Sequence, residues 1–91
     1  MSNPLTFEDA LEIAWHRIRN TLIERQRKYG VENISRHGEF GVLVRLDDKL
    51  ARLGNQEEHH DESREDTWVD VAGYGIIGLM VNRKIWGLPL A

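Results

Sequence analysis

In the stretch ESREDTWVDVAGYGIIGLM, residues 62–80, acidic residues lead directly into an almost wholly apolar segment. Glu62, Asp66 and Asp70 recur every four residues, so in a helix their side chains share one face. We therefore predict a helix over about 62–86, ended by the glycine and proline that follow it. Such a helix carries a line of carboxylates to the edge of the protein core, where aspartate is rarely found without a partner.

Two further helices are predicted on the N-terminal side of that stretch. Over residues 7–29, apolar side chains recur in steps of three or four and form one helical face: Phe7, Leu11, Trp15, Ile18 and Leu22. Over residues 41–54, leucines follow the same spacing and end at a glycine–asparagine pair. The intervening stretch VENISRHGEFG lacks such a period and is predicted to be a connection. Because no segment alternates every second residue, we expect one all-α domain over residues 1–91.

The predicted third helix is apolar on nearly all sides, which is typical of a helix surrounded by others. A chain of 91 residues supplies few neighbours, and a domain of this size buries only about 60–65% of the surface that its unfolded chain exposes. The sequence contains no cysteine, so disulfides add no stability. We therefore expect the three helices to complete a helical bundle by homo-oligomerisation, as a dimer or a tetramer.

Composition and charge narrow the class of protein. The net charge of -3 argues against a general nucleic-acid-binding protein, which normally shows a basic balance. The apolar run 71–81 is shorter than the ~20 residues that span a bilayer, and the N-terminal residues lack the pattern of a signal peptide. We expect a cytoplasmic protein without a membrane span.

The acidic line of the predicted third helix has two interpretations. Acids near a helix N-terminus are favoured by the helix dipole, and this explanation suffices for Glu62. Asp70 differs, because apolar residues surround it in the sequence. Together with Asp66, one turn earlier, it offers the carboxylate oxygens that Mg²⁺ prefers. Gly73, near the next turn, leaves room for a ligand or another backbone to approach closely.

A basic counterpart lies on the predicted second helix. Arg45, Lys49 and Arg52 share a face with Asp48, away from the leucines. Cations in this arrangement suit phosphate oxygens, which arginine binds in a bidentate fashion. On spacing alone, a solvated charged face is the favoured interpretation, and a phosphate site is the alternative.

Other polar and aromatic residues give weaker signals. His59 and His60 lie in an acidic stretch that is predicted to be a loop. Exposure to solvent is a simpler interpretation of these histidines than metal binding. The tryptophans fit a core or an interface, whereas Tyr29 and Tyr74 also suit stacking on a base. The sequence contains no P-loop, no dinucleotide-binding fingerprint and no evident nucleophile–base pair.

Three motifs resemble those of a known family. They are RKYG at 27–30, GVLVRLDDKLARL at 41–53 and EDTWVDVAGYGIIGL at 65–79. They look like the pattern KYG, G-x-x-x-R-x-x-D-K-x-x-R-L and D-T-x-x-D-x-A-G-Y of the small, often phage-encoded nucleotide-modification-associated domain. The layout is more distantly similar to the MazG-like all-α nucleoside triphosphate pyrophosphohydrolases. The match covers most of the chain, and its last two motifs are the more specific ones.

The resemblance implies a ligand and a set of site residues. In MazG-like enzymes, acids on facing helices bind Mg²⁺ (or Mn²⁺), and attack by water releases pyrophosphate. Asp70 matches the aspartate of the E-x-x-D helix motif, and Asp66 stands in for its glutamate with one extra residue of spacing. Asp48 is the remnant of the other helix motif. By this resemblance, Asp48, Asp66 and Asp70 catalyse, the same acids with Glu62 hold the metal, and the nucleotide contacts Lys28, Arg45, Lys49, Arg52 and Tyr74.

The second helix departs from the MazG-like pattern. That pattern is E-E-x-x-E, whereas this chain offers only Asp47 and Asp48, followed by Arg52 and Leu53. We expect a Mg²⁺-dependent nucleotide-binding protein that acts as a nucleoside triphosphate pyrophosphohydrolase, in the host cytoplasm if it is phage-encoded. Two alternatives stay open: a protein that sequesters or senses a nucleotide without cleaving it, and a helical protein-interaction module.

Overall fold

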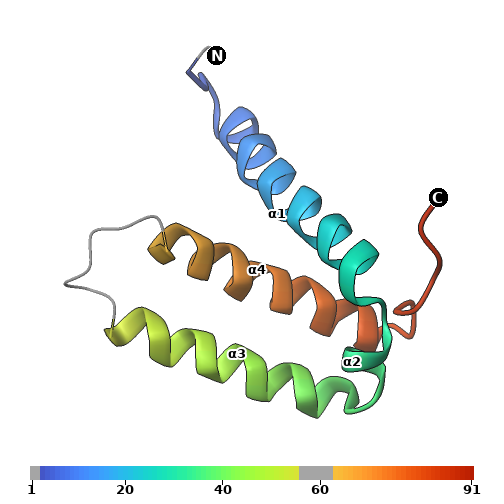
Figure 1. The fold of residues 1–91 in the computed structure, drawn as a ribbon. Coiled ribbons are helices and arrows are strands. Elements are labelled where there is room, and N and C mark those ends of the chain that lie inside the picture. The colour runs from blue at the N-terminus through green and yellow to red at the C-terminus, as the bar shows by residue number, and fades with distance from the viewer. Residues whose placement is uncertain (1–2, 56–62) are drawn as a thin grey trace.

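The computed structural model describes residues 3–55 and 63–91. These residues form four helices and no strand, so the all-α prediction is confirmed. The helices are α1 (Phe7–Tyr29), α2 (Glu32–Ser35), α3 (Gly38–Asn55) and α4 (Ser63–Asn82), in the arrangement of Figure 1. None of the described helices is long and apolar enough to cross a membrane.

Helix α1 has the predicted bounds. Thr6 caps its N-terminus, where the hydroxyl oxygen accepts a hydrogen bond of 3.0 Å from the Asp9 N–H. At the other end, Gly30 adopts a φ of 73° and donates its N–H to the Gln26 carbonyl oxygen. A left-handed φ favours glycine because glycine has no Cβ to clash, so this residue ends the helix.

The connection before α3 is more ordered than predicted. It contains the single helical turn α2, which buries Ile34, and α3 begins at Gly38 rather than at residue 41. Gly38 has a φ of 61° and so turns the chain from one helix into the next. Gly41 then lies in the first turn of α3, where an added Cβ would lie only 2.5 Å from the Cβ of His37. One helical turn is too short to show a period in the sequence.

Helix α4 ends at Asn82, four residues earlier than predicted. Its end is a Schellman motif, in which Lys84 adopts a φ of 61° and donates its N–H to the Val81 carbonyl oxygen. Ile85 donates its N–H to the Met80 carbonyl oxygen at 2.9 Å. Lysine rarely adopts this left-handed conformation. The sequence therefore predicts that the helix ends before Gly87 instead.

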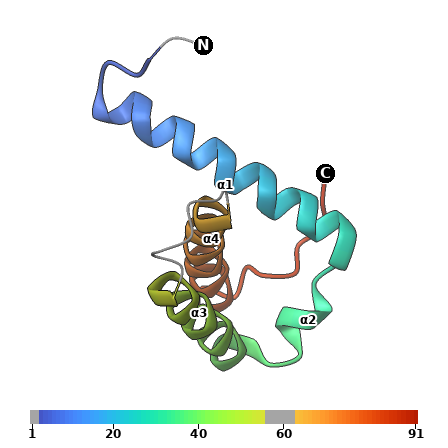
Figure 2. The same ribbon diagram turned by 60° about the vertical axis from the view of Figure 1, so that its left-hand side comes forward.

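Helices α3 and α4 run antiparallel, side by side, and α1 crosses α4 at a steep angle (Figure 2). The core of the molecule is small and lies near α2, where Ile34, Val42 and Ile77 are buried. Gly73 of α4 allows α1 to approach closely, since an added Cβ would lie 3.2 Å from Leu22 Cδ2. The predicted close approach at Gly73 is therefore made by a side chain of the protein's own first helix.

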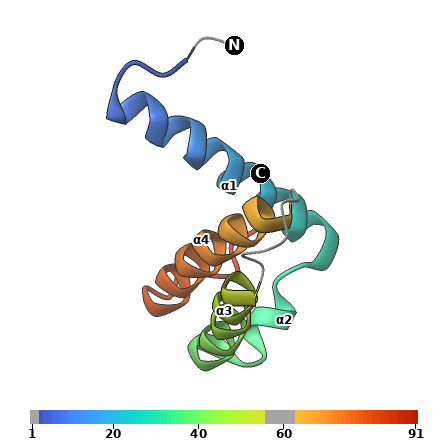
Figure 3. The ribbon, with the colours of Figure 1, turned by 90° about the vertical axis from the view of Figure 1, so that its left-hand side faces the viewer.

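Helix α1 is only partly supported by the rest of the molecule. None of its residues is buried, and its N-terminal half extends past the α3–α4 pair in every view (Figures 1 and 3). Beyond α4, the C-terminal segment folds back and is held where Trp86 Nε1 donates a 3.3 Å hydrogen bond to the Val31 carbonyl oxygen. This return brings the C-terminal residues to the cleft described next.

Candidate functional site

Asp70 lies at the centre of the candidate site. It is 8% exposed, and one basic residue approaches it from each neighbouring helix. Arg25 Nη1 of α1 lies 2.5 Å from its Oδ1, and Lys49 Nζ of α3 lies 3.1 Å from its Oδ2. The carboxylate of α4 thus ties all three long helices together through charge.

The Arg25–Asp70 pair is incomplete as a hydrogen bond. Its approach lies outside hydrogen-bond geometry, so Asp70 Oδ1 is buried beside a cation without receiving a hydrogen bond from any described residue. A buried acceptor in this state costs free energy relative to a satisfied one.

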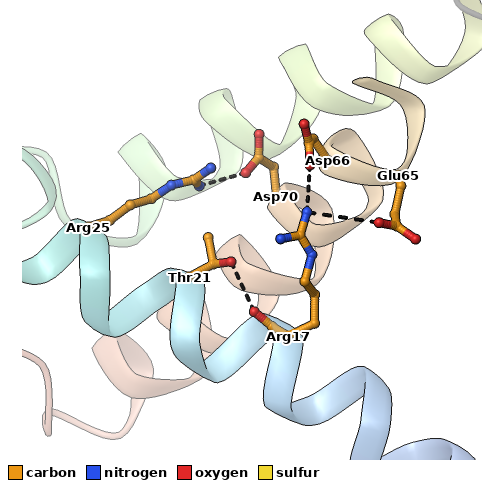
Figure 4. A network of polar contacts seen from close by, with 6 residues as sticks. All are labelled: Arg17, Thr21, Arg25, Glu65, Asp66 and Asp70. Atoms are coloured by element: carbon orange, nitrogen blue, oxygen red, sulfur yellow. Dashed lines mark hydrogen bonds and ion pairs between the residues drawn. The ribbon is translucent and has the colours of Figure 1, made fainter. Parts of the chain in front are cut away.

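A second ion pair lies one turn earlier on α4 and is exposed. Arg17 Nη2 donates to Asp66 Oδ1 at 2.5 Å and lies 4.0 Å from Glu65 Oε2. The Thr21 hydroxyl donates a 2.9 Å hydrogen bond to the Arg17 carbonyl oxygen, on the same face of α1 (Figure 4). Exposed pairs of this kind contribute little stability, so their role is to orient α1 across the start of α4.

A cleft of about 640 Å³ opens beside Asp70, between α1, α3, α4 and the C-terminal segment. Its lining includes the charged residues Arg25, Arg45, Lys49 and Asp70. The rest of the lining is mainly apolar and aromatic and includes Tyr29, Tyr74, Met80 and Trp86, together with the amide side chains of Gln26 and Asn33. Ligand pockets for small molecules commonly have this size and this mixture of apolar wall and few polar groups.

A smaller hollow of about 330 Å³ adjoins the cleft on the α3 side. It is lined by Asp48 and Arg52, and it shares Arg45, Lys49 and Tyr74 with the larger cleft. Arg45 and Lys49 are half-buried, whereas Asp48 and Arg52 are exposed. The basic face of the predicted second helix thus has two halves, one directed into the molecule and one solvated.

The cations of this region are not all neutralised. Lys49 and Arg25 contact Asp70, whereas Arg45 makes no ion pair with any described residue. Burying an unpaired charge, even in part, is costly unless a counter-charge accompanies it. Arg45 is therefore a half-buried cation that an anion in the cleft would neutralise.

The predicted acidic residues are dispersed between different partners. Asp66 and Asp70 are one turn apart on α4. Asp66 forms an ion pair with Arg17. Asp70 forms ion pairs with Arg25 and Lys49. Asp48 lines the smaller hollow, and no group of three histidine, aspartate or glutamate side chains within the described residues is placed to hold a metal ion. Glu62, His59 and His60 lie outside the described residues.

Lys28 lies apart from the cleft. Its Nζ is 5.5 Å from the centroid of the Tyr29 ring, whereas Tyr29 itself is a lining residue. The sequence did not indicate three lining residues, Arg25, Gln26 and Asn33. The sequence shows that basic residues lie at the end of the first helix. Their spacing does not predict which acid forms an ion pair with Arg25, because that depends on how α1 crosses α4.

Comparisons with protein-family models, with curated proteins and with solved structures found no match to this chain.

Proposed function

We propose that this chain binds a nucleotide in the cleft, with phosphates against Arg45 and Lys49 and the base against the aromatic wall. The observation that supports this most strongly is Arg45, a half-buried cation without an acidic partner among the described residues, which lines both hollows. The whole chain has a net charge of -3, so a local excess of cations at a cleft is not a consequence of composition. An anionic ligand balances this excess.

The apolar side of the cleft suits the other part of a nucleotide. Tyr74 lines both hollows together with Arg45 and Lys49, and Trp86 and Tyr29 also line the cleft. Stacking of a base on an aromatic side chain contributes about 1–3 kcal/mol and tolerates any base. The amides of Gln26 and Asn33 provide donors and acceptors for the edge of a base.

The motifs that resemble those of the nucleotide-modification-associated domain support the same class of ligand, because they contain Arg45, Lys49, Asp70 and Tyr74. A non-catalytic protein that sequesters or senses a nucleotide is the form of the proposal that these contacts support best. It requires only cations and an aromatic wall, and it requires no resident metal.

A nucleoside triphosphate pyrophosphohydrolase, similar to the MazG-like enzymes, is the second candidate. One observation favours it: Asp70 is a buried carboxylate beside cations suited to phosphate oxygens. In this form of the proposal, Mg²⁺ enters as part of the Mg²⁺–nucleotide substrate, since Mg²⁺ is commonly held by one or two carboxylates together with substrate phosphates.

Titration calorimetry with the common ribo- and deoxyribonucleoside triphosphates, in the presence of Mg²⁺, tests the proposal. We expect Arg45→Ala to weaken binding by about 10- to 150-fold, because a charged hydrogen bond contributes ~1.5–3 kcal/mol. The matched control is Arg36→Ala, which removes an exposed arginine that lines neither hollow and so leaves affinity unchanged. A parallel assay for pyrophosphate separates the two forms: release by the parent protein supports the hydrolase, and binding without release supports the sequestering protein. Equal affinities for the two variants contradict the proposed site.

A further inference from the structure

Gln26 of α1 is a polar residue of the cleft that takes no part in the ion pairs around Asp70. It is half-buried, it lines the cleft, and its side-chain amide makes no hydrogen bond with any described residue. Its backbone is fixed at the end of the helix, where the Gln26 carbonyl oxygen accepts a 3.0 Å hydrogen bond from the Gly30 N–H. A polar group that is partly removed from water is normally paired, so a ligand in the cleft gains by pairing with this amide.

The helical register places Gln26 on the face of α1 that is directed into the cleft. Residues at positions i, i+3, i+4 and i+7 of α1 share one helical face and line the cleft: Leu22, Arg25, Gln26 and Tyr29. This face is held against α4, because a Cβ added at Gly73 would lie 3.2 Å from Leu22 Cδ2. The amide of Gln26 is therefore presented by a supported helix, next to an aromatic ring one turn farther along.

Asn33, the other amide of the cleft, is less suited to selecting a ligand. It belongs to the single turn α2 and is exposed. An exposed amide already exchanges hydrogen bonds with water, whereas a half-buried amide without a partner gains more from a ligand. The cations of the proposed phosphate contacts, Arg45 and Lys49, lie on α3, so a ligand that spans the cleft meets them and Gln26 on different helices.

The chemistry of a carboxamide matches the edge of a nucleobase. The amide of Gln26 offers a donor N–H₂ beside an acceptor oxygen. Adenine presents the complementary pair with its exocyclic amine and a ring nitrogen, and glutamine binds adenine through two such hydrogen bonds. Phosphate oxygens are acceptors only, so they use only the donor of an amide. Gln26 therefore suits the base of a nucleotide better than its phosphates.

We propose that Gln26 reads the base of the bound nucleotide, through two hydrogen bonds between its amide and the edge of the base. This inference rests on the proposed nucleotide site and adds the residue that makes the site sensitive to the base. Aromatic stacking tolerates any base, and phosphate contacts are common to all nucleotides. Selection between bases therefore depends on hydrogen-bonding groups such as the amide of Gln26.

Titration calorimetry with two probes, a nucleoside triphosphate and inorganic tripolyphosphate, tests whether Gln26 contacts the base. Gln26→Ala is expected to weaken nucleoside triphosphate binding by about 2- to 12-fold for each hydrogen bond lost, and to leave tripolyphosphate binding unchanged. Arg45→Ala weakens the binding of both probes. Equal effects of Gln26→Ala on the two probes, or no effect on either, overturn this inference alone. A parent chain that binds neither probe overturns the proposed function and this inference with it.

Gln26→Glu tests the reading of the base directly, because a carboxylate accepts two hydrogen bonds and donates none. Guanine presents two adjacent donors, N1–H and N2–H₂, whereas adenine presents a donor beside an acceptor. The ratio of the affinity for guanosine triphosphate to that for adenosine triphosphate is expected to rise about tenfold. The matched control is Asn20→Asp, which makes the same change of charge at an exposed position of α1 that lines neither hollow, and which leaves the ratio unchanged. An unchanged ratio in Gln26→Glu, or an equal rise in both variants, overturns the proposal.

Discussion

Asp70 is the residue on which both the fold and the candidate site depend. Its carboxylate is buried and is neutralised from two sides, by a residue of α1 and a residue of α3. Removing one member of a buried ion pair leaves the remaining charges uncompensated, which costs more than the pair contributes by itself. The same charges that hold the helices together therefore define the polar side of the cleft.

We expect Asp70→Asn to lower the free energy of unfolding by about 2 kcal/mol, because Arg25 and Lys49 lose their common counter-charge while both retain partial access to water. The matched control is Asp66→Asn, which breaks an exposed pair and costs less than about 1 kcal/mol. Urea unfolding of both variants measures the difference. Equal losses contradict the assigned importance of Asp70.

The response of the protein to added Mg²⁺ depends on Asp66 and Asp70. Because Asp66 and Asp70 are occupied by arginine and lysine side chains, we expect Mg²⁺ alone to leave Tm unchanged. Mg²⁺ together with a nucleoside triphosphate raises Tm, since a ligand that binds only the folded chain stabilises it by about 2.7 kcal/mol at a hundred times its Kd. A rise in Tm with Mg²⁺ alone indicates a metal site in the protein itself and contradicts this expectation.

At the scale of the elements, the sequence predicts what depends on local pattern. The bounds of α1 follow from a capping threonine, a continuous apolar stripe and a terminal glycine, all of which are local. The end of α4 was misplaced because Lys84, a residue without the usual signal, adopts the left-handed conformation. The pairing of Arg25 with Asp70 is not predictable from either helix alone, because it is fixed by the crossing of two helices that are distant in the sequence.

The end of α4 gives a prediction of its own. Lys84→Gly is expected to raise the free energy of unfolding by up to about 1 kcal/mol, because glycine adopts a φ of 61° without the steric cost that lysine bears. Lys84→Ala, the control, removes the same side chain but keeps a Cβ and gives no such gain. Thermal unfolding of both variants distinguishes them, and equal stability of the two contradicts the assigned cap.

The glycines of α4 provide a second prediction. Gly75→Ala is expected to stabilise the protein by about 1 kcal/mol, because a Cβ there meets no atom and alanine favours the helix. Gly73→Ala gains less or destabilises, since its Cβ meets Leu22 at 3.2 Å and α1 or that side chain must move. A Gly73→Ala variant as stable as Gly75→Ala shows that α1 does not pack tightly at this position.

At the scale of the whole molecule, the chain has two unsatisfied surfaces of different chemistry. One is a cleft with a cation excess beside an aromatic wall, and the other is an apolar helix face that extends past the body of the molecule. The sequence indicated both in part, through the basic face of the second predicted helix and the apolar stripe of the first. Self-association through the apolar third predicted helix stays a prediction, and exposed apolar side chains lie on both α1 and α3.

The three tryptophans lie in different parts of the structure, so their signals can be followed separately. Trp86 lines the cleft and donates its indole N–H to Val31, Trp15 lies on the uncovered face of α1, and Trp68 is exposed on α4. Nucleotide binding in the cleft can therefore be followed through the indole signals in a ¹⁵N–¹H correlation spectrum, assigned with single tryptophan-to-phenylalanine variants. At constant protein concentration, Mg²⁺–nucleoside triphosphate is expected to shift the Trp86 signal and leave those of Trp15 and Trp68 in place. An unchanged Trp86 signal at saturating nucleotide, or equal shifts of all three, contradicts nucleotide binding in the cleft.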